Sequence, residues 1–324
     1  MRVESARSWD VYLPAWTRCM SDVHWFSEEH LLDYSREEQT DELEGEFQGE
    51  GNLFLMTVDD VGSCLGVLGM IIRGDVATVR RWEPAVPALH RDLGVGEALL
   101  ERGLEEARLR GVKSVRTILK YPYGSPLPWN GELYERHGFS RAKTGVNLVM
   151  DLEGDAGREP SESFETAPCD DYSIDEAVDF VLRAFASETE DREIHGGDET
   201  VSDPEGVRRI IEMEEQGRLG RTSPSLKRVA LVDGEPAGFI KCFIREEKYP
   251  PDFGLIGILG VFPEYRRRGI GYYLINHALT QFKGEGLRYA YVGTSEFNHK
   301  ALRAYEKAGF RPLFRQINYE KNLT

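Results

Sequence analysis

The sequence has few cysteines and no long apolar segment, and each shortage excludes a class of protein. Its four cysteines (Cys19, Cys64, Cys169 and Cys242) lie far apart without a Cys-x-x-Cys pair, which argues against a disulfide framework and a zinc site. No apolar run approaches the roughly 18–20 residues that cross a bilayer, and none follows Arg2, so we expect neither a membrane segment nor a signal peptide. We therefore expect a cytoplasmic protein that holds no metal.

Basic residues are also scarce, since 40 Lys and Arg stand against 56 Asp and Glu and the formal net charge is −16. A nucleic-acid partner requires a basic surface, so this balance disfavours one. It favours a cationic substrate such as an amine through long-range attraction, although solubility alone also accounts for it. The chain of 324 residues exceeds a typical domain of about 100–200 residues, so two domains are expected.

Two glycine-containing segments indicate an internal repeat. Residues 91–96 and 266–271 both read Arg-x-x-Gly-x-Gly. Each is followed by a segment with the apolar spacing of a helix, and both segments end at a glycine. A Tyr-x-x-x-Gly-Phe pattern then recurs at Tyr134 and Tyr305. Features that are repeated in the same order predict two copies of one fold.

A polar stretch rich in Gly, Pro and Ser, residues 153–162, separates the copies and is interpreted as a linker. We therefore predict an N-terminal domain over 1–152 and a C-terminal domain over 163–324, both of the mixed α/β class. The expected elements of the second copy are a strand near 163–169, helices over 173–187 and 203–217, strands over 227–232 and 237–245, a buried strand over 254–262, a helix over 269–282, a strand over 289–294, a helix over 300–307 and a pair of strands after Phe310.

The loop over 263–271, between a buried strand and an amphipathic helix, is suited to an anion. Unpaired N–H groups and the dipole at the start of a helix attract negative charge. Gly269 and Gly271 let a phosphate approach the backbone, and the arginines at 266–268 add positive charge. A diphosphate is the natural ligand, although a plain glycine-eased turn has the same pattern. The loop fits neither the Rossmann nor the Walker motif.

These residues resemble those of the GNAT superfamily of N-acetyltransferases. Residues 261–271 are similar to its acetyl-CoA diphosphate loop, and residues 298–310 are similar to its second signature, Asn-x-x-Ala-x-x-x-Tyr-x-x-x-Gly-Phe. The resemblance is close over about 163–324 and weaker over 1–152, so the chain resembles tandem-GNAT proteins. It implies two domains with mixed, mostly antiparallel sheets flanked by helices, and an acyltransferase that uses acetyl-CoA as cosubstrate.

The resemblance also implies roles for single residues. The strand before the loop would splay from its neighbour at a bulge near Gly260, and the main-chain N–H of Val261 would polarise the thioester carbonyl. Asn298 would bond the pantetheine arm or fix the loop. Tyr305 would lie near the sulfur and protonate the leaving thiolate, or would be only a core aromatic. The implied cofactor-binding residues are Leu259, Val261, Arg266, Arg267, Arg268, Gly269, Ile270, Gly271, Asn298 and Tyr305.

The general base is left open by the sequence, because the strand over 254–262 contains no carboxylate. An ordered water is one alternative. The candidate side chains are Glu296, Glu190, Asp191 and His195, whereas Glu264 follows Pro263 and is compatible with a side chain that only faces solvent.

The first copy keeps part of the loop and is a possible second cofactor site. The residues that it keeps are Arg91, Gly94, Val95 and Gly96. Asp92 replaces an arginine, Leu127 replaces the asparagine of the signature, and residues 121–129 form an aromatic, proline-rich insertion. We interpret this copy as degenerate.

The expected reaction is direct transfer of an acetyl group to the primary amine of a small molecule in a ternary complex, because no residue demands a covalent acetyl-enzyme. The alternatives are acetylation of a protein lysine or N-terminus, and a non-catalytic acyl-CoA sensor. We expect a monomer or a homodimer.

Overall fold

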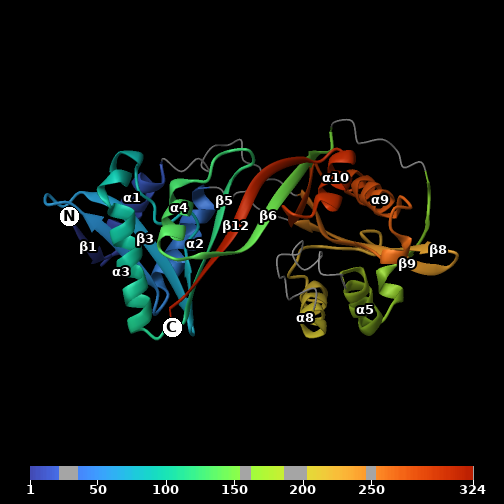
Figure 1. Ribbon diagram of the computed structural model, residues 1–324, viewed down its shortest axis with the longest axis horizontal. Coiled ribbons are helices and arrows are strands. Elements are labelled where there is room, and N and C mark those ends of the chain that lie inside the picture. Colours follow the sequence, from blue (N-terminus) through green and yellow to red (C-terminus); the bar gives the residue numbers. More distant parts are fainter. Residues whose placement is uncertain (22–35, 154–161, 186–202, 246–252, 324) are drawn as a thin grey trace. The chain divides into compact units, whose positions relative to one another are not determined.

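The computed structural model describes residues 1–21, 36–153, 162–185, 203–245 and 253–323 (Figure 1). The chain forms two compact units, here called the first unit (Met1–Ala142 with Gln316–Thr324) and the second unit (Lys143–Arg315). The first unit therefore includes residues 316–324, which follow the predicted linker at 153–162. The second unit includes residues 143–152, which precede it. Residues 154–161 of that linker lie outside the described residues.

The first unit contains a sheet in which most neighbouring strands are antiparallel. Its elements are β1 (Arg2–Ser5), α1 (Trp9–Met20), α2 (Arg36–Gln48), β2 (Leu53–Val58), β3 (Cys64–Arg73), β4 (Val76–Val79), η2 (Ala88–Leu93), α3 (Val95–Leu109), β5 (Ser114–Pro122) and α4 (Trp129–Arg136). Strands β1 to β4 pair antiparallel in sequence, whereas β4 and β5 run parallel.

Two long strands each contain residues of both units. Strand β6 spans Ser140–Asp151, and its residues from Gly145 onward pair with a strand of the second unit. Strand β12 spans Arg311–Asn322 without interruption, so the predicted pair of strands after Phe310 is wrong. The segment 311–322 contains no glycine or turn dipeptide that could reverse the chain, which explains the single strand.

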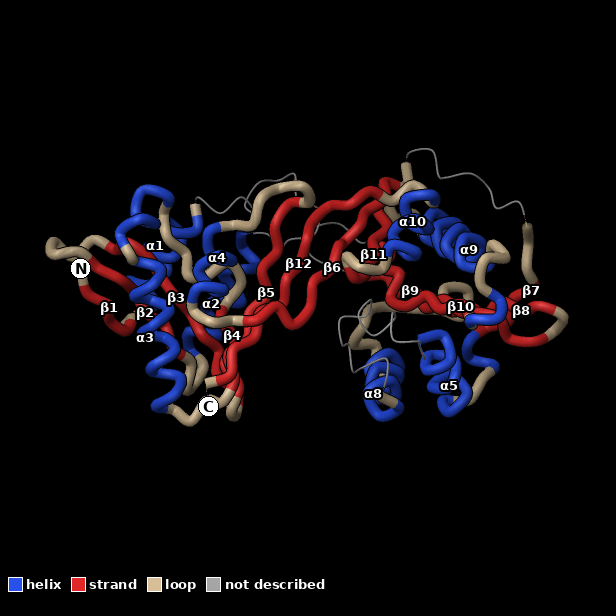
Figure 2. The backbone as a smooth tube through the Cα atoms, in the orientation of Figure 1, coloured by secondary structure: helices blue, strands red, loops and turns tan. Residues whose placement is uncertain are grey.

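The second unit repeats this order of strands and helices. Its elements are β7 (Glu165–Pro168), η3 (Cys169–Asp171), α5 (Ile174–Phe185), α8 (Pro204–Glu215), β8 (Lys227–Val232), β9 (Glu235–Arg245), β10 (Phe253–Val261), η4 (Pro263–Tyr265), α9 (Ile270–Gly284), β11 (Tyr289–Ser295) and α10 (His299–Lys307). The strand order is β6-β11-β10-β9-β8-β7, with β10 and β11 parallel and the other neighbours antiparallel. Helices α9 and α10 cover one face, and α5 and α8 cover the other (Figure 2). The predicted fold class is confirmed.

Local signals account for several of these elements. The Asp203 side chain accepts hydrogen bonds from the N–H groups of Glu205 and Gly206 and starts α8, with Pro204 at its first position. Asp233 and Gly234 have φ values of 54° and 81°, which is the tight turn that a β8–β9 hairpin needs. These predicted features are confirmed.

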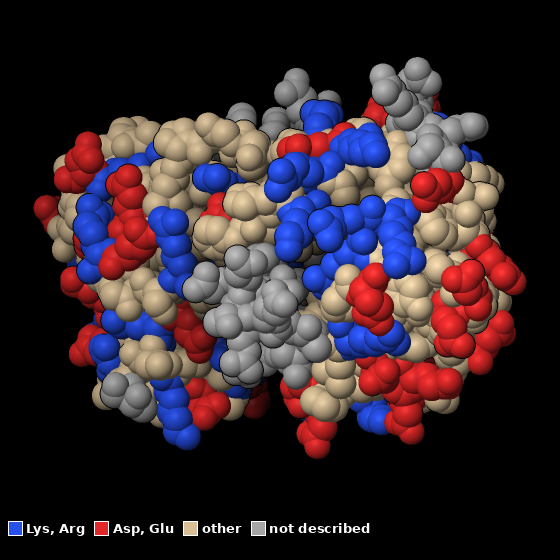
Figure 3. Space-filling model, turned by 45° about the vertical axis from the view of Figure 1, so that its right-hand side comes forward, with Lys and Arg blue, Asp and Glu red and all other residues tan. Residues whose placement is uncertain are grey.

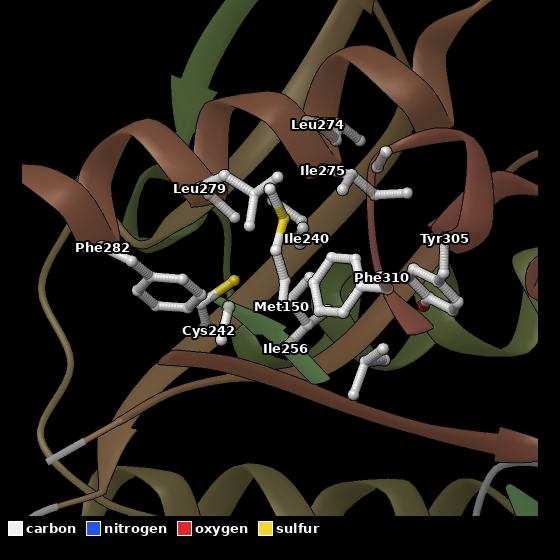
Figure 4. Close-up of a cluster of buried hydrophobic side chains, with 14 of the residues drawn as sticks. Met150, Ile240, Cys242, Ile256, Leu274, Ile275, Leu279, Phe282, Tyr305 and Phe310 are labelled. Carbon is white, nitrogen blue, oxygen red and sulfur yellow. The ribbon is translucent and has the colours of Figure 1, made fainter. Parts of the chain in front are cut away.

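The core of the second unit fixes α9 over the sheet (Figure 4). Leu274, Ile275 and Phe282 of α9 are fully buried against Ile240 and Cys242 of β9. Each such aliphatic or aromatic side chain contributes about 1.5–3 kcal/mol when buried. The start of α9 is therefore held rigidly at the end of β10.

The described residues include no group of three His, Cys, Asp or Glu side chains placed to hold a metal, and no described helix is both long and apolar enough to cross a membrane. All four cysteines are free and buried.

Candidate active site

Strands β10 and β11 run together and then part. They pair in parallel from Phe253–Tyr289 to Ile256–Val292, whereas β10 continues to pair with β9 as far as Val261. The register of β10 shifts between Ile256 and Ile258, so the bulge lies at Gly257 and the prediction of a bulge near Gly260 is wrong. A Cβ at Gly257 would come within 2.4 Å of the Phe243 ring, so this glycine permits the bulge.

The parted edge of β10 exposes main-chain groups. The Phe262 N–H donates to the Ala237 carbonyl at 3.0 Å, which makes Phe262 a residue that faces β9. In an antiparallel ladder the hydrogen-bonding direction alternates, so Leu259 and Val261 turn their N–H and C=O groups away from β9. These two predicted residues therefore line the side from which β11 diverges.

The start of α9 offers an open, uncapped helix end. Gly269 has a φ of 82°, no side chain of the described residues caps the helix, and its first turn contains no acid. A Cβ at Gly271 would meet only Cγ2 of Val261, at 3.6 Å, and a Cβ at Gly269 would have a Glu162 carboxylate oxygen nearest, at 3.8 Å. The free N–H groups of this turn could bind an anion such as a phosphate.

The three adjacent arginines have different surroundings. Arg266 donates from Nε to the Val261 carbonyl (3.2 Å) and from Nη2 to the Ala184 carbonyl (2.9 Å), so it braces the loop against β10 and α5. Arg267 has a φ of 64° and is exposed, and exposed Arg268 lies 5.4 Å from the Tyr265 ring centre. Only the last two present their charge to solvent.

The second signature builds α10 beside this site. The Asn298 side chain accepts a hydrogen bond from the Ala301 N–H at 3.0 Å and thereby caps α10. This hydrogen bond fixes the start of α10 and not the loop before α9. Tyr305 is 5% exposed and packs edge-on against Phe310, within the cluster that includes Ile256 and Val292, the last parallel pair (Figure 4).

The Tyr305 phenol is suited to remain protonated. Burial raises its pKa well above the usual value, and the neighbouring Cys242 thiol raises it further. Its hydroxyl makes no hydrogen bond to a described residue. A proton donor without an acceptor among the described residues therefore lies in the cluster at the point where the two strands part.

The candidate bases differ in what the structure shows of them. Glu296 follows β11 and pairs with Arg315 Nη2 at 3.5 Å. Glu264 pairs with Arg183, and its own backbone N–H and this arginine lower the pKa of its carboxyl. Glu190, Asp191 and His195 lie outside the described residues.

Sequence reasoning missed a buried ion network on the α8 side of the sheet. Glu214 of α8 binds Lys241 of β9 at 2.9 Å and Lys227 of β8 at 3.2 Å, and Lys227 also pairs with Asp170 at 2.7 Å. Removing one partner of such a pair typically costs about 3–5 kcal/mol, so the network ties α8 to the sheet. The single lysine at 241 within an apolar strand was the available signal.

The equivalent loop of the first unit is covered at Gly96, whereas a Cβ at Gly94 would meet no atom of the described residues within 4 Å. A Cβ at Gly96 would meet the Trp129 ring at 2.8 Å, and the Arg91 guanidinium lies 5.3 Å from the centre of the same ring. Glu97 stands in the first turn of α3 and pairs with Arg136 at 2.8 Å. The Trp129 ring therefore occupies the space at the start of α3, and the Glu97 carboxylate offsets the positive end of the helix dipole.

The first unit also contains a buried hydrogen-bond network around Glu83. Its parallel pairing ends at Thr78, and the carboxylate of fully buried Glu83 accepts hydrogen bonds from Trp16 Nε1 (2.9 Å) and the Gly69 N–H. The hydroxyl of Tyr134, the counterpart of Tyr305, donates to the Glu83 carbonyl. These contacts support a structural role for this copy.

Glu83 predicts a pH dependence of stability. Burial raises the pKa of its carboxyl to about 7 from 4.5, against the opposing charge of Arg80. A carboxyl whose pKa is raised by folding stabilises the fold fully below its unfolded value and loses this contribution as the pH rises through the folded one. We expect calorimetric melting temperatures to fall across this window, and to fall less in Glu83→Gln. Parallel pH profiles of the two proteins would contradict the assignment.

The splayed parallel pair of strands and the glycine loop at the open start of α9 lie in the part of the chain that a known family matches. Residues 192–310, within the second unit, match the model of the acetyltransferase (GNAT) family. The second unit thus contains a region that matches the GNAT acetyltransferase family.

Two similar proteins are mycothiol acetyltransferases. That of Geodermatophilus obscurus is 28% identical over 68% of this chain and 67% of its own length, and that of Stackebrandtia nassauensis is 27% identical over 86% of both. Among solved structures, a GCN5-related N-acetyltransferase from Sphaerobacter thermophilus has a TM-score of 0.62 at 18% identity and covers 99% of this chain and 95% of its own. A tandem GNAT protein from the clavulanic acid biosynthesis pathway has a TM-score of 0.51 at 16% identity and covers 100% and 99%. The fold over the whole chain is therefore that of tandem GNAT proteins.

Proposed function

We propose that the second unit transfers the acetyl group of acetyl-CoA directly to the primary amine of a small molecule in a ternary complex. The observation that supports this most is the pairing of an open, uncapped start of α9 with the parted edges of β10 and β11. The first gives a place for a diphosphate, and the second gives a slot for an extended arm.

In this proposal the main chain binds and the phenol donates a proton. N–H groups from Arg267 to Gly271 hold the diphosphate, and those of Leu259 and Val261 face the arm and the thioester carbonyl. The amine nitrogen attacks the carbonyl carbon, the carbon–sulfur bond breaks, and the thiolate takes the proton of the Tyr305 hydroxyl. The proton lost by the amine passes to water or to a carboxylate such as Glu296. That group then returns a proton to the Tyr305 phenolate.

A small-molecule acceptor is supported by the names of the two relatives, which are both mycothiol acetyltransferases. The net charge of −16 favours the approach of a cationic amine. The covered position at Gly96 supports a single binding site per chain. The cytoplasmic location and the oligomeric state stay predictions.

Calorimetric titration and a turnover screen test the proposal. We expect acetyl-CoA to bind with one site per chain, and its consumption to rise with one or more members of a panel of small amines. Turnover confined to peptides would identify a protein acetyltransferase, and binding without turnover on either panel would favour a sensor. Two equal sites per chain would contradict the degenerate first copy.

A further inference from the structure

We propose that five exposed basic side chains, two in the loop before α9 and three on α10, recognise the 3′-phosphate on the adenosine of coenzyme A. This inference rests on the proposed function and assigns a further part of the same ligand. The side chains, called the cationic group below, are Arg267, Arg268, Lys300, Arg303 and Lys307.

The cationic group is a local excess of positive charge in an acidic protein. The chain carries a net charge of −16, yet none of the five makes an ion pair with a described residue. Other exposed arginines of the unit do so, for example Arg208 with Asp175 and Arg221 with Glu285. Figure 3 shows Lys and Arg side chains gathered on the face of the second unit that it draws.

Three cations of this group lie close enough on α10 to repel one another. Lys300, Arg303 and Lys307 are spaced three and four residues apart on α10, so they share one face. Like charges at this spacing repel and destabilise a helix by a few tenths of a kcal/mol. An anionic ligand would offset that repulsion among the three cations.

The first unit provides an internal comparison with the same fold. At the positions that correspond to the cationic group it has Asp92, Leu93, Trp129, Glu132 and Arg136. Arg136 is the one cation among these, and it is neutralised by Glu97. The basic side chains are therefore absent where the glycine loop is covered, and present where it is open.

One contact of Lys307 leaves its positive charge without a neutralising carboxylate among the described residues. Tyr272 stands at the position of Glu97, and Lys307 Nζ lies 4.4 Å from the centre of its ring. The same helix–helix contact thus uses an ion pair in the first unit and a cation–π contact in the second. A ring attracts the ammonium group without cancelling its charge.

The position and charge select the 3′-phosphate. Tyr272 is in the first turn of α9, next to Gly271, so Lys307 lies beside the proposed diphosphate site. In coenzyme A the ribose that follows the diphosphate carries a phosphate monoester, with about 1.5–2 negative charges at neutral pH. Solvent-exposed Lys and Arg side chains suit such a terminal group, whereas the main-chain N–H groups at the start of α9 suit the diphosphate.

The test compares acetyl-CoA with its 3′-dephospho form by calorimetric titration of the full chain. The unaltered protein is expected to bind acetyl-CoA about 10–100-fold more tightly. Arg303→Gln/Lys307→Gln is expected to remove most of this preference and to leave the affinity for the dephospho form unchanged. Lys283→Gln, an exposed cation at the far end of α9, is the control and should keep the preference.

Two results would overturn the inference while leaving the proposed function intact. One is an equal affinity of the unaltered protein for both ligands, and the other is an equal loss of both affinities in the double variant, which would assign the cations to the diphosphate. If neither ligand binds at all, the proposed function fails, and this inference fails with it.

Discussion

Gly271→Glu is expected to raise the dissociation constant for acetyl-CoA at least about 100-fold and to remove turnover. The added carboxylate would stand among the N–H groups that are proposed to hold the diphosphate, where it both fills the space and repels the ligand. Loss of two hydrogen bonds to a charged group, at about 1.5–3 kcal/mol each, accounts for this factor.

The fold should tolerate this substitution. A Cβ at Gly271 meets its nearest neighbour at 3.6 Å, and a glutamate in the first turn of a helix interacts favourably with the dipole. Gly284→Glu, at the open far end of the same helix, introduces the same side chain away from the site and should bind normally. Titration of both variants decides the matter, and unchanged binding by the first would remove this loop as the site.

Tyr305→Phe is expected to lower kcat about 100-fold or more with little change in the affinity for acetyl-CoA. A proton donor to a leaving group typically contributes about 10²–10⁴ in rate. Stability should be preserved, because the hydroxyl bonds to no described residue. Since burial raises the pKa of this phenol, its ionisation should not limit activity across the neutral range.

Tyr134→Phe is the matched control in the first unit. Its hydroxyl donates to the Glu83 carbonyl, so its loss should cost about 1 kcal/mol of stability and leave turnover intact. Steady-state kinetics and thermal melts of the two variants separate the roles. Full activity of Tyr305→Phe would assign that tyrosine to the core alone.

The sequence predicted those parts of the fold that depend on neighbouring residues. The φ of 82° at Gly269, the cap at Asp203 and the turn at Asp233 all follow from side-chain chemistry within a few positions. Strand β12 and the division into units were not predictable in this way, because the partner of a strand is set by contacts distant in sequence. The course of the chain after Phe310 was therefore misjudged.

The candidate site shows the same division. The glycines of the loop were assigned from their pattern, and they lie at an open helix start. The brace formed by Arg266 was not foreseen, because three adjacent arginines look alike until Ala184 and the Val261 carbonyl are in place. The bulge at Gly257 depends likewise on the Phe243 ring, which belongs to another strand.

The division into units has a spectroscopic consequence. All five tryptophans occur before residue 143, and they include Trp16 beside Glu83 and Trp129 on the covered loop. Indole emission therefore originates from the first unit, whereas the second unit contributes only tyrosine. Selective excitation of indole can follow the melting of one half of the molecule while acetyl transfer reports on the other.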